Sequence, residues 1–427
     1  MYEKEKVVFP LTLPRGVFIT CNDDNLDSNS SDFHGTAISI NAHPTIQNSR
    51  QRTPFPELQK ATVGLKLPTD FITVKPAYLL NKKPQLPKTR YNAPLQPSIT
   101  SVFKRAEGKE QMWLNATEFI FKDGVELAAP VGWAAFHAQA IQEPVFPIES
   151  AVLNIWPDKA STPSMQKHSM ETAISVTNKL NPGQIPVLTV DEPLYAICKQ
   201  LQLQHPDSLG EDKIFIMLGQ LHIEICIQNM LAMLLESSGW SDALSAAGIA
   251  SPGRADSLAK SSHDVNLAGY AHEITCAALH NLMIDAYNEE ITENQIQIEK
   301  TPFEQWKVKC EESHPVFHFW SLILKLEILY RIFVRSLREA NFQLYKEALV
   351  AWVKWTHALD RKNYRRWLPI HLRDLVQLET RHPALYQAFI QGLFVASRTS
   401  ARFSAMGLDQ VTITWLTNQK VLFINID

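Results

Sequence analysis

The sequence has no paired cysteines, no strong net charge and no long uninterrupted hydrophobic run. Its five cysteines are odd in number and scattered without a CxxC pair, which argues against a disulfide framework or a zinc ribbon and suits a reducing compartment. The longest apolar stretch, 317–334, is interrupted by charged residues, and we recognise no secretory signal. We therefore expect an intracellular protein without a membrane span.

A net charge of −3 over 427 residues gives no global basic field, so any nucleic-acid binding must depend on local patches. The sequence also contains no GxGxxG, P-loop, HExxH or GxSxG motif, which removes the strongest signals for dinucleotide binding, P-loop phosphate binding, zinc proteolysis and serine hydrolysis. At this length, with 45% hydrophobic residues, the chain can bury a large core and form two or more domains.

The most regular pattern lies in residues 184–231. An apolar, β-branched run at 185–190 predicts a buried strand, residues 194–203 a helix, and residues 213–218 a second buried strand. Such a strand–helix–strand unit normally has parallel strands covered on both faces. Asp191 and His222, which follow the two strands, should then lie at the carboxyl edge of the sheet, where α/β proteins place their sites.

Two short strands are expected near the N-terminus, at 16–20 and 35–40, with an acidic loop between them. The loop contains Asp23, Asp24, Asp27 and Asp32. Four acids in a loop are ordinarily a solvated surface, but one of them could instead lie at the exit of a central strand and bind a divalent cation. A third strand is predicted at 151–156 and a helix at 164–180.

The rest of the chain divides by composition. Residues 44–145 are rich in proline and polar residues and predict an irregular insertion, whereas residues 238–395 show helical periodicity and predict an all-helical domain. Cationic side chains recur in that domain, namely Arg331, Arg335, Arg338, Arg361, Lys362, Arg365 and Arg366. A salt-bridged solvent face is the favoured interpretation, and a phosphate-binding strip beside Tyr364 and Trp367 is the alternative.

Seven stretches in a fixed order carry a resemblance that covers residues 19–410: VLTVDEPLYAICKQLQ, GEDKIFIMLGQLHIE, SGWSDAL, FHFWSLILKLE, VRSLREANFQLY, NYRRWLPIHLRDL and FSAMGLDQ. Together they resemble a transposon-derived family of uncharacterised animal proteins, similar to DDE transposases. The resemblance implies an α/β fold, with a ribonuclease-H-like mixed sheet flanked by helices and a large helical insertion after the fifth strand. Residues 1–43 and 146–237 would form the core, and residues 396–427 an atypical tail.

In such cores three acids hold two Mg²⁺ or Mn²⁺ ions, which activate water or a 3′-hydroxyl for phosphoryl transfer on DNA. By position, Asp24 matches the acid of the first strand, Asp191 matches the acid after the fourth, and His222 resembles a histidine that often follows the fifth strand. The resemblance thus implies catalytic and metal-binding roles for Asp24 and Asp191, a supporting role for His222, and nucleic-acid contacts for the seven cationic residues.

The tail departs from the family pattern. The family continues after FSAMGLDQ with a helix whose glutamate is the third ligand, whereas this chain continues with VTITWLTNQKVLFINID. We therefore expect a truncated, catalytically incomplete site, with Glu339, Glu379 and Asp409 as possible substitutes. The expected function is DNA binding by a transposase-derived protein, in the nucleus rather than the cytoplasm. The alternative is a non-enzymatic interaction protein that reuses the scaffold, with protein partners or a second copy of the chain.

Overall fold

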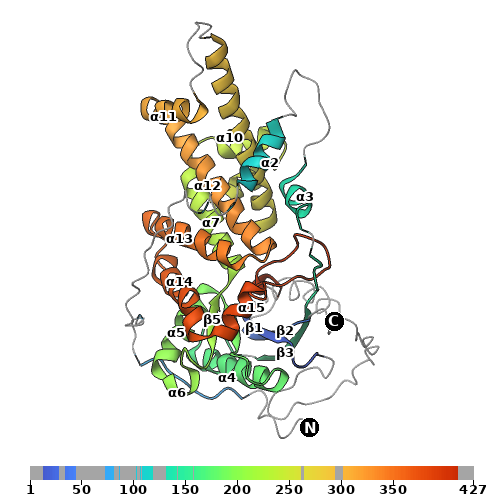
Figure 1. The fold of residues 1–427 in the computed structure, drawn as a ribbon. Coiled ribbons are helices and arrows are strands. Elements are labelled where there is room, and N and C mark those ends of the chain that lie inside the picture. Colours follow the sequence, from blue (N-terminus) through green and yellow to red (C-terminus); the bar gives the residue numbers. More distant parts are fainter. Residues whose placement is uncertain are drawn as a thin grey trace, which may run out of the picture.

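A computed structural model describes residues 13–27, 34–44, 73–80, 86, 102, 106, 108–118, 131–141, 143–156, 158–260, 264–293 and 302–411. It contains a five-stranded mixed sheet with a tall assembly of helices above it and α4, α5 and α6 at its base (Figure 1). The sheet order is β3-β2-β1-β4-β5. The strands are β1 (Phe18–Asp27), β2 (His34–His43), β3 (Glu149–Trp156), β4 (Val187–Val190) and β5 (Phe215–Leu218).

The N-terminal hairpin is confirmed, but its first strand is longer than predicted. β1 and β2 pair antiparallel from Phe18 opposite His43 to Asp27 opposite His34. Asp23 and Asp24 are therefore strand residues, where a loop was expected. Pairing with β2 supplies backbone partners that outweigh the low strand propensity of Asn and Asp. Asp32 lies outside the described residues.

The strand–helix–strand unit is also confirmed. β4 and β5 are parallel, with Val187 opposite Phe215 and Val190 opposite Leu218, and α5 (Glu192–Gln204) connects them with the short α6 (Pro206–Leu209).

Asp191 caps α5, because its side chain accepts a hydrogen bond from the Leu194 N–H at 3.0 Å. Pro193 lies in the first turn, where its missing N–H leaves no helical hydrogen bond unmade. α4 (Pro163–Leu180) packs against β1 and β4.

The predicted helical region is confirmed within the described residues. It comprises α7 (Gln220–Leu235), α8 (Trp240–Ala246), α9 (Pro252–Lys260), α10 (Val265–Glu293), α11 (Phe303–Ser313), α12 (Pro315–Arg338), α13 (Phe342–Ala358), α14 (Tyr364–Arg381) and α15 (Pro383–Ile390). Apolar side chains from the sheet and from most of these helices form one continuous core, and a smaller cluster lies under α8 and α9. No helix in the described part of the chain is long and apolar enough to span a bilayer.

The segment expected to be irregular contains two helices. α2 (Lys109–Glu118) packs against α10 and α12, and α3 (Trp133–Ala138) buries Trp133 and His137. Most of residues 44–108 lie outside the described residues, as does the strand-like sequence 412–427. The division of the chain into domains stays a prediction, since one core crosses the boundary expected at residue 238.

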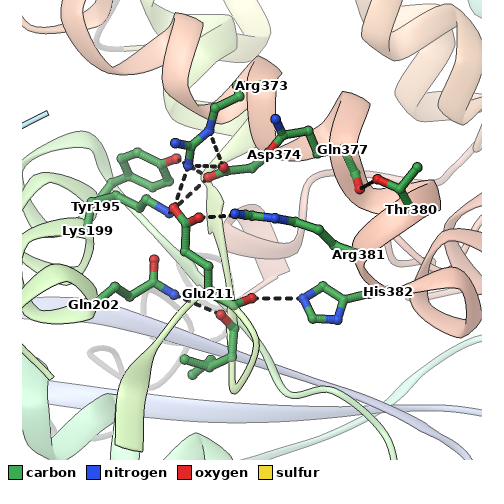
Figure 2. Close-up of polar contacts among 11 residues, drawn as sticks. Tyr195, Lys199, Gln202, Glu211, Arg373, Asp374, Gln377, Thr380, Arg381 and His382 are labelled. Carbon is green, nitrogen blue, oxygen red and sulfur yellow. Dashed lines mark hydrogen bonds and ion pairs between the residues drawn. The ribbon is translucent and has the colours of Figure 1, made fainter. Parts of the chain in front are cut away.

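An ion cluster with a buried centre and a solvent-exposed edge at Arg381 fixes α14 to the sheet layer (Figure 2). It consists of Lys199, Glu211, Arg373, Asp374 and Arg381. The Lys199 ammonium lies 2.7 Å from Glu211 and 3.0 Å from Asp374, and the Arg373 guanidinium also contacts both carboxylates. Arg381 reaches the second oxygen of Glu211 at 2.5 Å. Because Lys199 belongs to α5 and Glu211 precedes β5, the cluster locks the end of the helical region onto the strand–helix–strand unit.

Candidate metal and nucleic-acid site

Asp24, in the second half of β1, lies beside Asp191, which directly follows the adjacent parallel strand β4. β1 and β4 pair with Cys21 opposite Leu188 and Asn22 opposite Thr189. Continued by two residues, this register sets Asp24 opposite Asp191, and neighbouring strands are about 4.8 Å apart. Residues opposite one another in a parallel pair project from the same face. The structure thus brings together two acids that are far apart in the sequence.

His222 and Asp409 complete the cluster. His222 stands in the first turn of α7, directly after β5, and its Nδ1 lies 2.9 Å from an Asp409 carboxylate oxygen. The segment that carries Asp409 is held over the sheet, because the Asn22 side-chain amide donates to the Leu408 carbonyl at 2.9 Å. Asn22 and Asp24 alternate onto the same face of β1, so this segment covers the face that carries the acids.

The cluster is electrostatically coupled. Burial raises the pKa of Asp24 to about 6, although the positive charge of His222 opposes the shift, and burial also raises the pKa of Asp191. Burial alone would lower the pKa of His222, but its hydrogen bond to Asp409 and the charges of Asp409, Asp191 and Asp24 raise that pKa to about 9. His222 is therefore a cation at neutral pH that partly neutralises the surrounding carboxylates.

Asp409 is one of three acids that were possible substitutes for the third metal ligand, and nothing in the sequence favours it over the other two. Glu339 pairs with Lys109 and Arg335 at the far end of α12, and Glu379 is exposed on α14. Asp409 alone of the three joins the cluster, but both of its oxygens are engaged. They accept hydrogen bonds from the Leu221 and His222 N–H groups at 3.1 and 3.2 Å. Asp409 thereby caps the N-terminus of α7, where a carboxylate is favourable.

The two remaining acids suit one hard cation rather than two. Asp24 and Asp191 each use one oxygen to accept a backbone N–H, from Asn25 at 2.8 Å and from Leu194 at 3.0 Å, which leaves the second oxygen of each as a candidate ligand. Mg²⁺ is commonly held by one or two carboxylates together with water and substrate phosphate. Among the described residues, no group of three or more His, Cys, Asp or Glu is placed to hold a metal ion.

Asp23 faces away from this cluster. Its carboxylate accepts a hydrogen bond from the Gln166 side chain of α4 at 2.8 Å, on the opposite face of the sheet, and it is almost fully buried. Burial raises its pKa to about 7, against the effect of the polar side chains of Ser169 and Gln166, which lower it. Asp23 is therefore a buried acid of the core and not a member of the solvated loop that the sequence predicted.

The structure separates the seven cationic candidates into two groups. The first group lies on α12, and its burial corrects the prediction that these residues contact nucleic acid. Arg331 and Arg335 are buried. Arg331 packs over the rings of Trp133 and Tyr330 and donates to the Gly269 carbonyl at 3.1 Å, while Arg335 lies 3.1 Å from Glu110 of α2. Because both guanidinium groups are buried and paired inside the helical region, neither can contact a nucleic acid in this structure. Arg338, one turn further, is half-buried.

The second group lies at the start of α14, next to the acids. Lys362, Arg365 and Arg366 are exposed, with Arg365 paired to the exposed Asp360, and Arg361 is half-buried. Tyr364 joins this group to the cluster, since its hydroxyl donates to the His222 carbonyl at 2.9 Å. The charge of Arg366 also acts on Glu192, the residue after Asp191, whose pKa burial raises to about 7. A basic surface therefore borders the acid cluster on the α14 side.

An apolar cavity of about 580 Å³ lies elsewhere, between α8, α10 and α12. Its walls include Trp240, Met283 and Trp320, and its rim carries the exposed side chains of Leu282 and Val316. None of the residues that line it is acidic, basic or a histidine or cysteine. The cavity is thus suited to binding apolar groups and is separate from the acid cluster.

The described residues define a mixed α/β protein with an acidic and basic site at the carboxyl edge of its sheet. A family profile described as a domain of unknown function, DUF8702, matches residues 288–420. That stretch contains Asp409, the cations at the start of α14 and the helices from α11 to α15. No curated protein and no solved structure matches the chain.

Proposed function

We propose that this protein is derived from a DDE-type transposase and binds nucleic acid, with a phosphoryl-transfer site that is catalytically incomplete. The observation that carries the proposal is the pairing of Asp24 with Asp191. Asp24 lies where β1 passes the end of β4, Asp191 directly follows β4, and exposed cations at the start of α14 lie beside them. Carboxylates that bind a divalent cation next to groups that bind phosphate form the combination that phosphoryl transfer requires.

The sheet supports a ribonuclease-H-like core. Its first three strands are antiparallel neighbours, the fourth and fifth are parallel to the first, and the first lies at the centre of the order β3-β2-β1-β4-β5. Asp24 is on the first strand, Asp191 follows the fourth, and the helical region follows the fifth. These are the positions that the resemblance to DDE transposases implies.

The chemistry of the site depends on which of its side chains are already engaged in hydrogen bonds and ion pairs. Asp24 and Asp191 would hold one Mg²⁺ or Mn²⁺, which would polarise a bound phosphate. His222, as a cation, would attract the phosphate into the site. The third carboxylate, Asp409, caps α7 and pairs with His222, so it is not available to complete the set of ligands for a second ion. Binding is thereby retained while two-metal catalysis is not.

Cleavage of duplex DNA is accordingly expected to stay at background. The test uses labelled duplex with Mg²⁺ or Mn²⁺, and compares the wild-type chain with Asp191→Asn. The two should give the same trace of product, because a single ion cannot stabilise both the attacking and the leaving oxygen. Metal-dependent cleavage that disappears in Asp191→Asn would show that the site is complete.

DNA binding should be weak and steeply dependent on salt, because a local cationic surface must supply it. We expect a dissociation constant of roughly 10⁻⁴–10⁻⁶ M at physiological salt, typical of non-specific binding. Replacing Lys362 and Arg366 by alanine should reduce the slope of log K against log salt by about 2, that is about 0.9 for each lost phosphate contact. Fluorescence anisotropy over a salt series measures the slope.

The control for that series is the double variant Arg254→Ala/Lys260→Ala, which removes two exposed charges from α9. It should bind like the wild type. Equal losses in both double variants would mean that total charge, and not the surface at α14, determines the affinity. A DNA-binding role would place the protein in the nucleus.

The apolar cavity favours a second candidate function, a non-enzymatic interaction protein. Leu282 and Val316 are 64% and 71% exposed at its rim, an unusual degree of exposure for neighbouring large apolar side chains. A partner that inserted an apolar side chain between α10 and α12 would bury both. This function would use the helical region and would not require the acid cluster.

A further inference from the structure

A loop at the β3 edge of the sheet, opposite the β5 edge, carries two further cations. Residues 397–405, SRTSARFSA, contain Arg398 and Arg402 and no acidic residue. Both arginines and the three residues between them are exposed. Neither guanidinium forms an ion pair with any of the residues that the structure describes, whereas Arg331 and Arg335 are paired with acidic side chains. The loop therefore presents two cationic side chains to solvent.

The loop is built to hold these side chains in place. Ala396 and Met406 close its base by exchanging two backbone hydrogen bonds, of 3.0 and 2.8 Å. Ser397 accepts a hydrogen bond from the Ile148 N–H at 2.8 Å, which ties the loop to the chain just before β3. Phe403 is buried against Trp133 and His137 of α3, with ring centroids 5.1 and 5.5 Å away. The exposed tip is thus anchored at three points.

The position of the loop relates it to the acid cluster. The chain leaves the loop and runs directly to Leu408 and Asp409, which contact Asn22 and His222. α14 packs against β5, one edge of the sheet, whereas Ser397 is tied to the start of β3, the opposite edge. In Figure 1 the segment after α15 extends across the sheet toward α3. The two exposed basic surfaces therefore flank the acids.

We infer that residues 397–405 form the second wall of a nucleic-acid groove, with Arg398 and Arg402 binding backbone phosphates. The inference rests on the proposed function and adds to it a second contact surface, beyond the cations of α14. The partner is a polyanion because the loop offers two guanidinium groups with no carboxylate of its own, and guanidinium binds phosphate through paired N–H donors. A strand bound to both walls would pass over Asp24 and Asp191.

The test compares the full-length wild type with Arg398→Ala/Arg402→Ala, Arg398→Lys/Arg402→Lys and the α9 control Arg254→Ala/Lys260→Ala. Each binds a labelled duplex of random sequence in a salt series, followed by anisotropy. The alanine pair should lower the salt slope by about 2, from about 0.9 for each lost phosphate contact, while the lysine pair and the α9 control keep the wild-type slope. Circular dichroism checks that each variant is folded.

The outcomes separate this inference from the proposed function. If the wild type binds with a steep salt slope and the alanine pair binds equally well, the loop is not part of the groove, and the proposed function stands on α14 alone. If the alanine pair and the α9 control lose the same affinity, the loop has no specific role and the inference fails. If the wild type shows no salt-dependent binding, both the inference and the proposed function fail.

Discussion

Replacing Asp374 by alanine is expected to lower the free energy of unfolding by about 3–5 kcal/mol, because it removes one carboxylate from a buried ion cluster and leaves its cations in place. Asp374 is 5% exposed and contacts Lys199 and Arg373, which are 2% and 1% exposed. Tyr195 also donates a hydrogen bond to it at 3.2 Å. After the substitution Glu211 would be the remaining carboxylate for three cations, two of which, Lys199 and Arg373, are almost fully buried.

The matched control is Asp212→Ala, beside Glu211. The Asp212 side chain is 68% exposed and pairs with Lys213 in solvent, so its loss should change stability by less than about 1 kcal/mol. Urea unfolding followed by tryptophan fluorescence and by circular dichroism measures both variants. Similar midpoints for the two variants would contradict a stabilising role for the cluster (Figure 2).

The strand–helix–strand unit could be predicted because its signals are local. An apolar β-branched run, then Asp191 as a helix cap and Pro193 in the first turn, specify where β4 ends and α5 begins. The N-terminal hairpin was predicted with the correct partners and with β1 too short. Its extension to Asp27 depends on pairing with β2, which the composition of 21–27 does not reveal.

The site was only partly predictable. Asp191 and His222 follow the two strands of the predicted parallel pair, so the sequence pattern could bring them to one edge of the sheet, whereas a place for Asp24 beside them was implied only by the resemblance to DDE transposases. Asp409 could not be chosen over Glu339 or Glu379, because it reaches His222 across 187 positions of sequence. Only the structure shows that Asp409 contacts His222 and that both of its oxygens already accept hydrogen bonds at the start of α7.

The cationic strip shows a different limit. Spacings of four and three place Arg331, Arg335 and Arg338 on one helix face, but periodicity does not tell a solvent face from a buried one. The partners that bury Arg331 and Arg335 come from α2, α3 and α10. α2 and α3 lie in a segment predicted to be irregular, and although the apolar run at 131–137 indicated packing against the core, it did not show which helix face it would cover.

Replacing Asp23 by asparagine is expected to stabilise the protein progressively as the pH rises. Burial raises the pKa of Asp23 in the folded protein to about 7, whereas an unfolded aspartate titrates near 3.8. The proton is bound more tightly by the folded state, so this contribution to stability is fully present below pH 3.8 and is lost as the pH rises through about 7. Asparagine carries no charge to bury, keeps an acceptor for Gln166 and can donate toward Ser169.

Relative to wild type, the free energy of unfolding of Asp23→Asn should therefore rise by about 3 kcal/mol between pH 5 and pH 8, from about 1.36 kcal/mol for each pKa unit in that interval. Urea unfolding at both pH values in the presence of EDTA gives the difference without any effect of metal on neighbouring Asp24. Asp207→Asn, at an exposed position in α6, is the control and should show no such change. An equal effect of Asp23→Asn at pH 5 and pH 8 would mean that the buried carboxylate is already ionised at pH 5, held by Gln166 and Ser169 more strongly than burial opposes it.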